Sequence, residues 1–169
     1  MKLTELLLDE LENEARLTRR ALEQVPEGQH GWKPHEKSMV FGYLADLVAS
    51  VPSWVNMIVT RNELDVVPPA GSQMKRDPMN TSSEFLSALD KSMAGAREAL
   101  KTTTDEHLMT PWRLLAAGKV VSEASRYRTI RDTINHWVHH RGQMTVYLRL
   151  MGAKVPALYG PSADDSRFD

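Results

Sequence analysis

The sequence contains no cysteine and no long uninterrupted apolar run, and each absence excludes a class of structure or chemistry. Without cysteine the chain forms no disulfide, no thiolate metal site and no cysteine nucleophile. No segment approaches the ~20 apolar residues that a membrane-spanning helix needs. A signal peptide is not expected either, because acidic residues follow the N-terminus closely, at Asp9, Glu10 and Glu12. These features predict a soluble, cytoplasmic protein with no membrane partner.

The chain also lacks an excess of charge of either sign. Lysine and arginine total 21 and aspartate and glutamate total 22, which gives a formal net charge of -1. A protein without a positive field has little long-range attraction for nucleic acid, so we expect no nucleic-acid partner. At 169 residues and 41% hydrophobic content, the chain fits one domain, residues 1–169, with a core of its own.

Four stretches have the apolar periodicity of amphipathic helices. They are expected over residues 4–25, 38–61 and 81–102, and from residue 122 or 125 to residue 151. Ser38 is a favourable N-cap for the second helix, and Gly152 ends the fourth. Pro52 has no backbone N–H and clashes with the preceding turn, so a kink or a short break is expected just before it.

The connections between these helices are expected to be irregular. Residues 27–37 form a polar connection whose Trp32 should pack on the helices, and residues 63–80 form a long crossover. Residues 103–121 are expected to be a structured loop, since the runs 112–114 and 120–121 are too short to assign as strands. Four helices that each bury one apolar stripe, with no assigned sheet, predict an all-α four-helix bundle.

The fourth helix carries two histidines, His136 and His140, four residues apart. On a helix this spacing places both side chains on one face, with Cβ atoms roughly 5–6 Å apart. They lie along the edge of the apolar stripe formed by Ile130, Ile134, Trp137, Met144, Leu148 and Met151. A site built on them would therefore lie inside the bundle or at its mouth, and neutral imidazoles suit zinc or nickel.

Several motifs together are specific. They are Trp32-Lys33-Pro34-His35-Glu36-Lys37-Ser38, Leu44-Ala45, Pro52-Ser53-Trp54, Pro111-Trp112, Asn135-His136-Trp137-Val138-His139-His140-Arg141-Gly142-Gln143, Val146-Tyr147-Leu148-Arg149, Val155-Pro156 and Tyr159-Gly160-Pro161-Ser162-Ala163-Asp164. In these motifs, over nearly its whole length, the chain resembles the DinB/YfiT-like superfamily. The resemblance implies an up-down-down-up four-helix bundle, commonly a homodimer, often with a divalent metal such as nickel or zinc.

In that superfamily three histidines hold the metal, and two of them match His136 and His140. The position that matches the third is Leu47. Asp46 is a possible third ligand, but it lies about 100° from Leu47 around an ideal helix and needs a local rotation or kink to reach the site. His35 or Glu36 could also swing in from the connection. The alternative is that both histidines are hydrogen-bonded residues at the edge of a dry core that holds no metal.

Neighbouring side chains of the fourth helix have simpler interpretations. His139 should point to solvent, and Arg141 should pair with a buried acid or a loop carbonyl. Gln143 and Tyr147 follow His140 along nearly the same face, where they would support the histidines or line a pocket with Leu47. For Tyr147, plain packing is the favoured alternative.

Two functional hypotheses follow. The first is a pocket for a small-molecule substrate around His136 and His140, in a metal-binding protein that the resemblance relates to hydrolases and thiol-dependent transferases. The second is a metal-free bundle that binds a ligand or dimerises and has lost catalysis, because Leu47 stands where the third histidine would be. The sequence does not decide whether the protein is an enzyme, which metal it would use, or which substrate.

Overall fold

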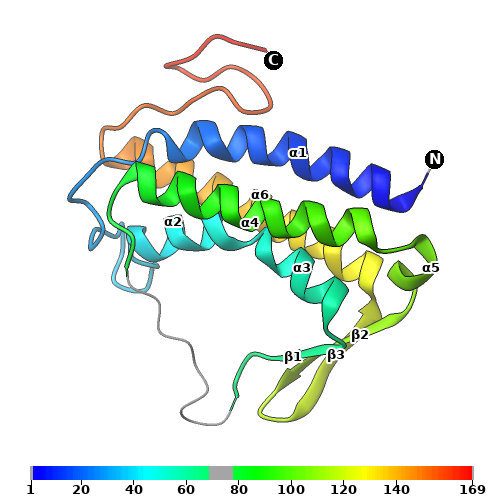
Figure 1. The fold of residues 1–169 in the computed structure, drawn as a ribbon. Helices are drawn as coiled ribbons and strands as arrows, with labels where there is room; N and C mark the ends of the chain where they lie inside the picture. Colours follow the sequence, from blue (N-terminus) through cyan, green and yellow to red (C-terminus); the bar gives the residue numbers. More distant parts are fainter. Residues whose placement is uncertain (1, 69–77, 169) are drawn as a thin grey trace.

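The computed structural model describes residues 2–68 and 78–168, which are mostly helical with one small sheet (Figure 1). In chain order the elements are α1 (Leu3–Leu22), α2 (Phe41–Ser50), α3 (Ser53–Thr60), β1 (Glu63–Asp65), α4 (Ser82–Thr102), α5 (Asp105–Leu108), β2 (Pro111–Ala116), β3 (Lys119–Ser125) and α6 (Arg126–Leu150). The helical prediction is confirmed in outline, whereas the all-α prediction is wrong because of the three strands.

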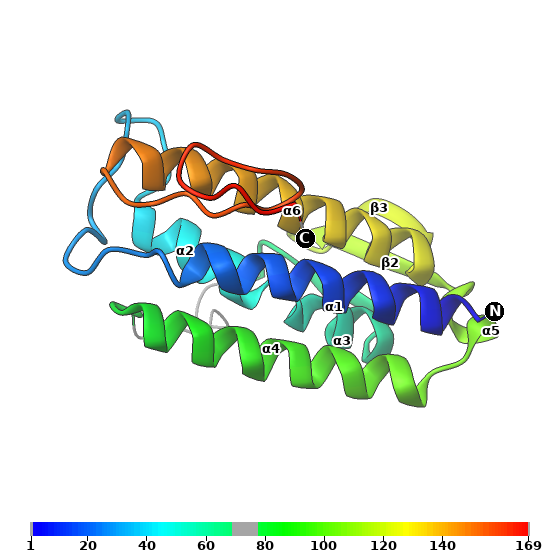
Figure 2. The same ribbon diagram turned by 90° about the horizontal axis from the view of Figure 1, so that it is seen from above.

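The long helices lie side by side, as two views show (Figures 1 and 2). Helices α1 and α6 run towards one end of the molecule, and α2, α3 and α4 run towards the other. Helix α1 contacts α4 and α6, and both α2 and α3 contact the same two helices. The apolar stripes therefore converge on one core, whose largest fully buried apolar side chains include Trp137, Phe41 and Phe85. Within the described residues no single helix is long and apolar enough to cross a membrane, although the bent pair α2 and α3 meets that criterion together.

The kink expected at Pro52 is confirmed. It separates α2 from α3, whose axes differ by 51°. Because Pro52 has no N–H, the carbonyl of Val48, four residues earlier, lacks its usual helical donor. The indole Nε1 of Trp137 on α6 donates to this carbonyl instead, at 2.7 Å. The break in one helix is thereby joined to the neighbouring helix by a buried hydrogen bond.

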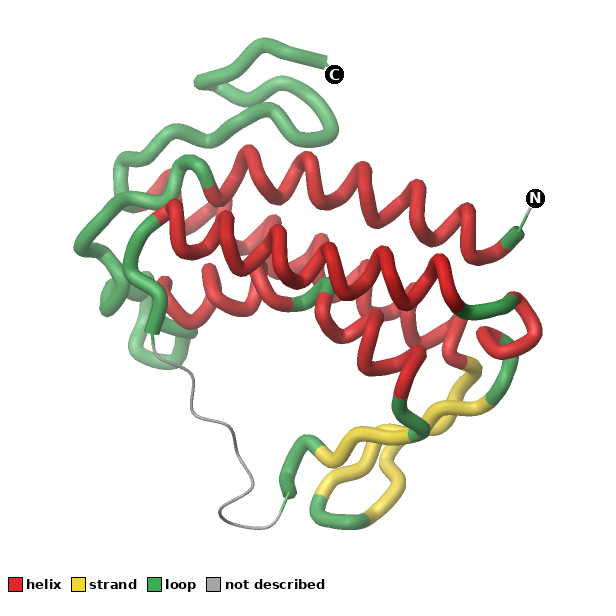
Figure 3. Tube along the Cα trace, in the orientation of Figure 1, coloured by secondary structure: helices red, strands yellow, loops and turns green. Residues whose placement is uncertain are grey.

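The small sheet lies at one end of the helices, beside α3 and the start of α6 (Figure 3). Its strand order is β1-β2-β3, with β1 parallel to β2 and β2 antiparallel to β3. Asp65 supports the β2–β3 turn by accepting hydrogen bonds from the backbone N–H groups of Ala117 (3.0 Å) and Gly118 (2.7 Å), both of which have positive φ. These hydrogen bonds, that from Gly118 above all, lower the pKa of Asp65.

The sheet corrects two of the expected connections. Residues 103–121 are not a loop, because they contain α5, β2 and the start of β3, and the crossover contains β1. Residues 69–77 of that crossover lie outside the described residues. Each strand is short, and β1 pairs with a strand about fifty residues later in the chain. Such a pairing leaves no local periodicity for the sequence to reveal.

Helix ends also differ from expectation. The second helix begins at Phe41, not at Ser38, because the connection itself supplies acceptors: the N–H of Phe41 donates to the carbonyl of Trp32 (2.8 Å), and that of Gly42 to the carbonyl of His30 (2.9 Å). A Cβ at position 42 would lie only 3.1 Å from the His30 Cβ, so glycine permits this close approach. Of the two starts considered for the fourth helix, the one capped by Ser125 is confirmed, since its hydroxyl accepts the N–H of Arg128.

Candidate ligand-binding site

His136 and His140 lie one turn apart on α6, and the structure brings their rings together. The ring centroids are 4.3 Å apart with an interplanar angle of 76°. Trp54 of α3 stacks on the ring of His136, at 5.3 Å between centroids. His140 is buried, and its Nδ1 is 2.8 Å from Oε1 of Gln143. His139 is exposed, as its helical position predicts.

The surroundings of His136 favour its neutral form. Burial lowers the pKa of His136, and the nearby His140 and His139 lower it further because a second positive charge would be repelled. A neutral imidazole has one nitrogen that donates and one that accepts a hydrogen bond. His136 can therefore serve as a hydrogen-bonding group as well as a ligand for a metal.

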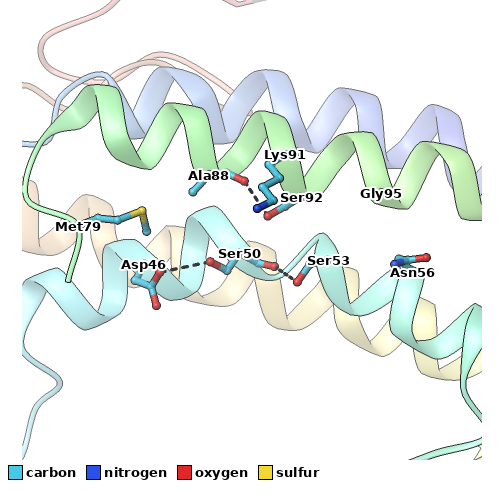
Figure 4. A pocket seen from close by; sticks show the side chains of 9 residues that line it. All are labelled: Asp46, Ser50, Ser53, Asn56, Met79, Ala88, Lys91, Ser92 and Gly95. Carbon is cyan, nitrogen blue, oxygen red and sulfur yellow. Dashed lines mark hydrogen bonds between the residues drawn. The ribbon is translucent and has the colours of Figure 1, made fainter. Parts of the chain in front are cut away.

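The other candidate ligands do not meet these two histidines. Leu47 is partly buried and packs against the core, and it provides no donor atom. Asp46 accepts a hydrogen bond from Ser50 Oγ at 3.3 Å and lines a cavity between α2, α3 and α4 (Figure 4). His35 accepts the N–H of Lys37 within the exposed connection. Across residues 2–68 and 78–168, no three histidine, aspartate, glutamate or cysteine residues form a group that could hold a metal ion. The side chains present therefore do not fit a three-histidine centre.

A cavity of about 420 Å³ opens beside His136, between α3, the sheet and α6. Eight of its thirteen lining residues are apolar. The lining consists of Trp54, Met57, Ile58, Leu64, Val66, Trp112, Leu114, Ser122, Ala124, Thr129, Asp132, Thr133 and His136. Sequence reasoning placed a pocket near His136 but missed most of these residues. Five of them lie on strands that it did not assign: Leu64, Trp112, Leu114, Ser122 and Ala124.

The polar groups of this cavity differ in how far their hydrogen bonds are satisfied. The hydroxyls of Thr133 and Thr129 donate to backbone carbonyls one turn earlier, at 2.9 and 3.0 Å. Asp132 accepts from Arg128 Nε at 3.3 Å. Trp112 is only 5% exposed, yet its indole Nε1 has no hydrogen-bond partner among the described residues. Sequence reasoning gave Trp112 no role in a site, and only its place in the motif Pro111-Trp112 could have drawn attention to it.

The second cavity, shown in Figure 4, has a volume of about 580 Å³ and shares no lining residue with the first. Its serine hydroxyls already donate to other groups of the protein. Ser53 donates to the Ser50 carbonyl and Ser92 to the Ala88 carbonyl, each at 2.7 Å. Asp46 therefore belongs to a polar groove along α4, apart from the histidines.

On another side of α6, Arg141 has the structural role that was expected. Its guanidinium pairs with the buried carboxylate of Glu14 at 2.6 Å and also donates to Thr18 Oγ1 at 3.1 Å. The Tyr159 hydroxyl joins this group: it donates to Glu14 at 2.7 Å and accepts from Arg141. Burial and the hydrogen bond to Glu14 raise the pKa of Tyr159 to about 12. The cluster ties the C-terminal tail to α1 and α6.

The two remaining residues predicted for the site have different surroundings. Gln143 contacts His140 directly through its side-chain oxygen. Tyr147 packs against the rings of Trp32 (5.6 Å) and Phe41 (6.3 Å), and its hydroxyl donates to the Met39 carbonyl at 3.2 Å. The packing alternative for Tyr147, and the packing of Trp32 on the helices, are thus both observed.

Comparison with known proteins places this geometry in a family. A DinB-like protein from Bacillus subtilis (YjoA) superposes with a TM-score of 0.68 over 96% of this chain and 99% of its own, at 16% identity. A DinB-like protein from Bacillus cereus ATCC 10987 gives a TM-score of 0.66 over 92% and 97%, at 20% identity. The uncharacterized protein YrdA of Bacillus subtilis (strain 168) is 30% identical over 112 residues, which are 66% of this chain and 62% of YrdA, less than two thirds of that relative. The model of the DinB family matches residues 1–167, and the chain therefore belongs to the DinB family.

Proposed function

We propose that the protein binds a small, mainly apolar molecule in the cavity beside His136. The observation that carries this proposal is the cavity itself. Its volume of about 420 Å³ lies within the ~300–1,000 Å³ typical of ligand pockets. Its lining is mostly apolar with a few polar groups, the pattern by which such pockets combine affinity with orientation. The binding site lies where α3, the sheet and α6 meet.

The walls of the cavity suit a flat apolar molecule. Trp54 and His136 present stacked rings on one side, and Trp112 contributes a third aromatic group. Aromatic side chains bind apolar surface strongly because they are large and lose little conformational freedom. Binding of this kind requires no metal, and among the described residues the two histidines have no third protein ligand beside them.

The probe 2-ethylnaphthalene, which is apolar throughout, tests this proposal. We expect it to shift the amide signals of cavity residues in ¹H–¹⁵N spectra of the wild-type protein. Ala124→Phe places a large side chain in the cavity and should weaken binding at least about tenfold. Val121→Phe is the matched control, because Val121 is exposed on the same strand and does not line the cavity. Absence of binding to the wild type, or equal binding to Ala124→Phe, contradicts the proposal.

A second candidate function is a metal-dependent hydrolase or thiol-dependent transferase, and the observation that favours it is the 4.3 Å separation of the His136 and His140 rings. Elemental analysis of protein without an affinity tag, after incubation with nickel and zinc, tests it. Less than about a tenth of an equivalent of metal argues against this candidate, since catalytic zinc normally has three protein ligands. Leu47→His should then supply a third imidazole and increase nickel affinity at least about tenfold; unchanged affinity would show that position 47 does not face the two histidines.

The remaining proposals concern the helix topology, the oligomeric state and the cellular location. We infer that the long helices form the up-down-down-up bundle of the family, in line with their directions in Figures 1 and 2. A homodimer in the cytoplasm remains our proposal from the family resemblance. Light scattering that gives the mass of one 19.1 kDa chain at working concentration would contradict the dimer.

A further inference from the structure

We propose that the molecule bound in the cavity beside His136 is uncharged and carries a carbonyl oxygen, which accepts a hydrogen bond from the indole Nε1–H of Trp112. This inference rests on the proposed function, because it names the class of ligand for the same cavity. Trp112 then orients the ligand. The apolar body of the molecule lies between two walls: the rings of Trp54 and His136, and the apolar side chains of the strands.

The first reason is the unsatisfied donor. Trp112 is 5% exposed, and its Nε1 has no acceptor among the residues that the structure describes. Buried polar groups in proteins are nearly always hydrogen-bonded, so each one without a partner needs an explanation. Trp112 lines the cavity, although its Nε1 itself has almost no accessible surface, so a small turn of the indole towards the cavity would let a bound molecule supply the acceptor that the described protein atoms do not.

The second reason is the position of Trp112 in the sheet. It lies on β2, the central strand, and its partner across β3 is Ala124. Directly paired residues share a face of an antiparallel sheet, and both of these line the cavity. The small side chain of Ala124 leaves space beside the indole, where a larger residue would pack against it. The sheet thus places the residue that carries a buried, unpaired N–H donor at the wall of the cavity.

The third reason is the charge of the lining. Among the thirteen described lining residues there is no lysine or arginine, and the one residue with a full charge is Asp132. Asp132 already pairs with Arg128, so a ligand carboxylate would find no lysine or arginine in the lining, and burying an unpaired charge in an apolar setting is unfavourable. The threonine hydroxyl hydrogens are already donated to the backbone, so they do not compete for the acceptor. Ser122 and His136 also line the cavity and can donate, but the Trp112 indole is the buried donor without a partner, and a neutral carbonyl oxygen matches it without these costs.

Two matched probes, 2-acetylnaphthalene and 2-ethylnaphthalene, test the inference, because they differ in a carbonyl oxygen that replaces two hydrogens. The ratio of their dissociation constants is measured by titration for the wild type and for Trp112→Phe. Since solvation of the probes is the same in both titrations, the change in the ratio reports the contact with residue 112. We expect the ketone to lose about tenfold relative to the hydrocarbon in Trp112→Phe, the effect of one buried hydrogen bond. Trp32→Phe is the control, because Trp32 packs on Tyr147 and does not line the cavity, and it should leave the ratio unchanged.

A second readout is taken on the wild type, and the variant serves only to assign one signal. In ¹H–¹⁵N spectra of the wild type, the indole signal that is missing from Trp112→Phe belongs to Trp112. We expect 2-acetylnaphthalene to move this signal downfield and 2-ethylnaphthalene to move it less. If both probes bind but the signal responds equally, or the ratio is the same in wild type and variant, the inference is overturned and the proposed function stands. If neither probe binds, the proposed function fails with it.

Discussion

Two buried tryptophans of this protein, Trp137 and Trp112, differ in whether the indole N–H has a hydrogen-bond acceptor. Both are nearly inaccessible to solvent, at 1% and 5% exposure. The indole N–H of Trp137 donates to the Val48 carbonyl that Pro52 leaves without a helical donor. The indole N–H of Trp112 meets no acceptor among the described residues and lies in a residue that lines a cavity. The first donor is committed to the fold, and the second is the one to which we assign a ligand.

Arg141 extends the comparison along α6. On the side of the helix that faces α1, its guanidinium binds the Glu14 carboxylate, the Glu14 carbonyl, Thr18 and Tyr159. On the side that faces the sheet, the partners of His136 are the rings of Trp54 and His140, which contact it by stacking and by an edge. Buried polar groups rigidify a core when their hydrogen bonds are all satisfied. Those without a partner are costly in free energy unless a ligand or water binds them. The contrast separates the structural side of α6 from the side where we place the ligand.

The largest expected effect on stability comes from disrupting the cluster around Arg141, on the side of α6 that faces α1. Glu14→Ala removes the partner of Arg141, whose side chain is 1% exposed, and leaves a buried charge without compensation. We expect a loss of about 3–5 kcal/mol in the free energy of unfolding, measured by chemical denaturation. Glu12→Ala is the control, because its ion pair with Arg97 is roughly 40% exposed on both sides and should contribute about 0–1 kcal/mol. Similar losses for both variants would show that the Arg141 cluster is no more stabilising than a surface pair.

The next effect compares the two tryptophans directly. Trp137→Phe leaves the Val48 carbonyl without its donor, which should cost about 1–3 kcal/mol beyond the loss of packing. Trp112→Phe loses similar packing but removes a donor that had no partner, so its cost should be at least about 1 kcal/mol smaller. Thermal and chemical denaturation of both variants measure the difference. Equal destabilisation would mean that the Trp112 indole also has a partner in the free protein, such as an ordered water.

A smaller effect tests why Trp137 is needed. Residue 52 has helical dihedral angles, φ -56° and ψ -26°, so alanine fits there and restores an N–H near the Val48 carbonyl. The cost of Trp137→Phe should therefore be lower by about 0.5–1.5 kcal/mol in a Pro52→Ala background. A double-mutant cycle measures this coupling. Additive effects would indicate that the bend between α2 and α3 persists without proline and keeps the restored N–H away from the carbonyl.

The comparison also shows which features local sequence can predict. Helix positions, the kink at Pro52 and the pairing of His136 with His140 all follow from spacing along one segment, and these were predicted. The pairing of β1 with β2 joins residues about fifty positions apart, and the cavity collects side chains from α3, three strands and α6. The β2–β3 hairpin is local, but its apolar runs were too short to assign as strands. Whether Trp112 finds an acceptor depends on that assembly and not on its neighbours in sequence. Asp46 differs, because helical spacing already placed it about 100° from Leu47, and it lines the cavity along α4 and does not meet the histidines.

The smallest expected effect concerns Tyr159, at the edge of the cluster around Arg141 and Glu14. Its pKa is raised to about 12 by burial and by the hydrogen bond to Glu14, whereas tyrosine in an unfolded chain titrates near pH ~10. The folded protein therefore keeps this proton after the unfolded chain has lost it, so the stabilisation is fully present below pH ~10 and is lost as the pH rises to about 12. Tyr159→Phe should remove this dependence. Because Tyr159 is 65% exposed, solvent screening limits the effect to less than about 1 kcal/mol. The stability difference between wild type and variant, measured by denaturation from about pH 8 to about pH 11, should shrink as the pH rises; a constant difference would mean that the Tyr159 hydroxyl does not share its hydrogen bond with the Glu14 carboxylate in solution.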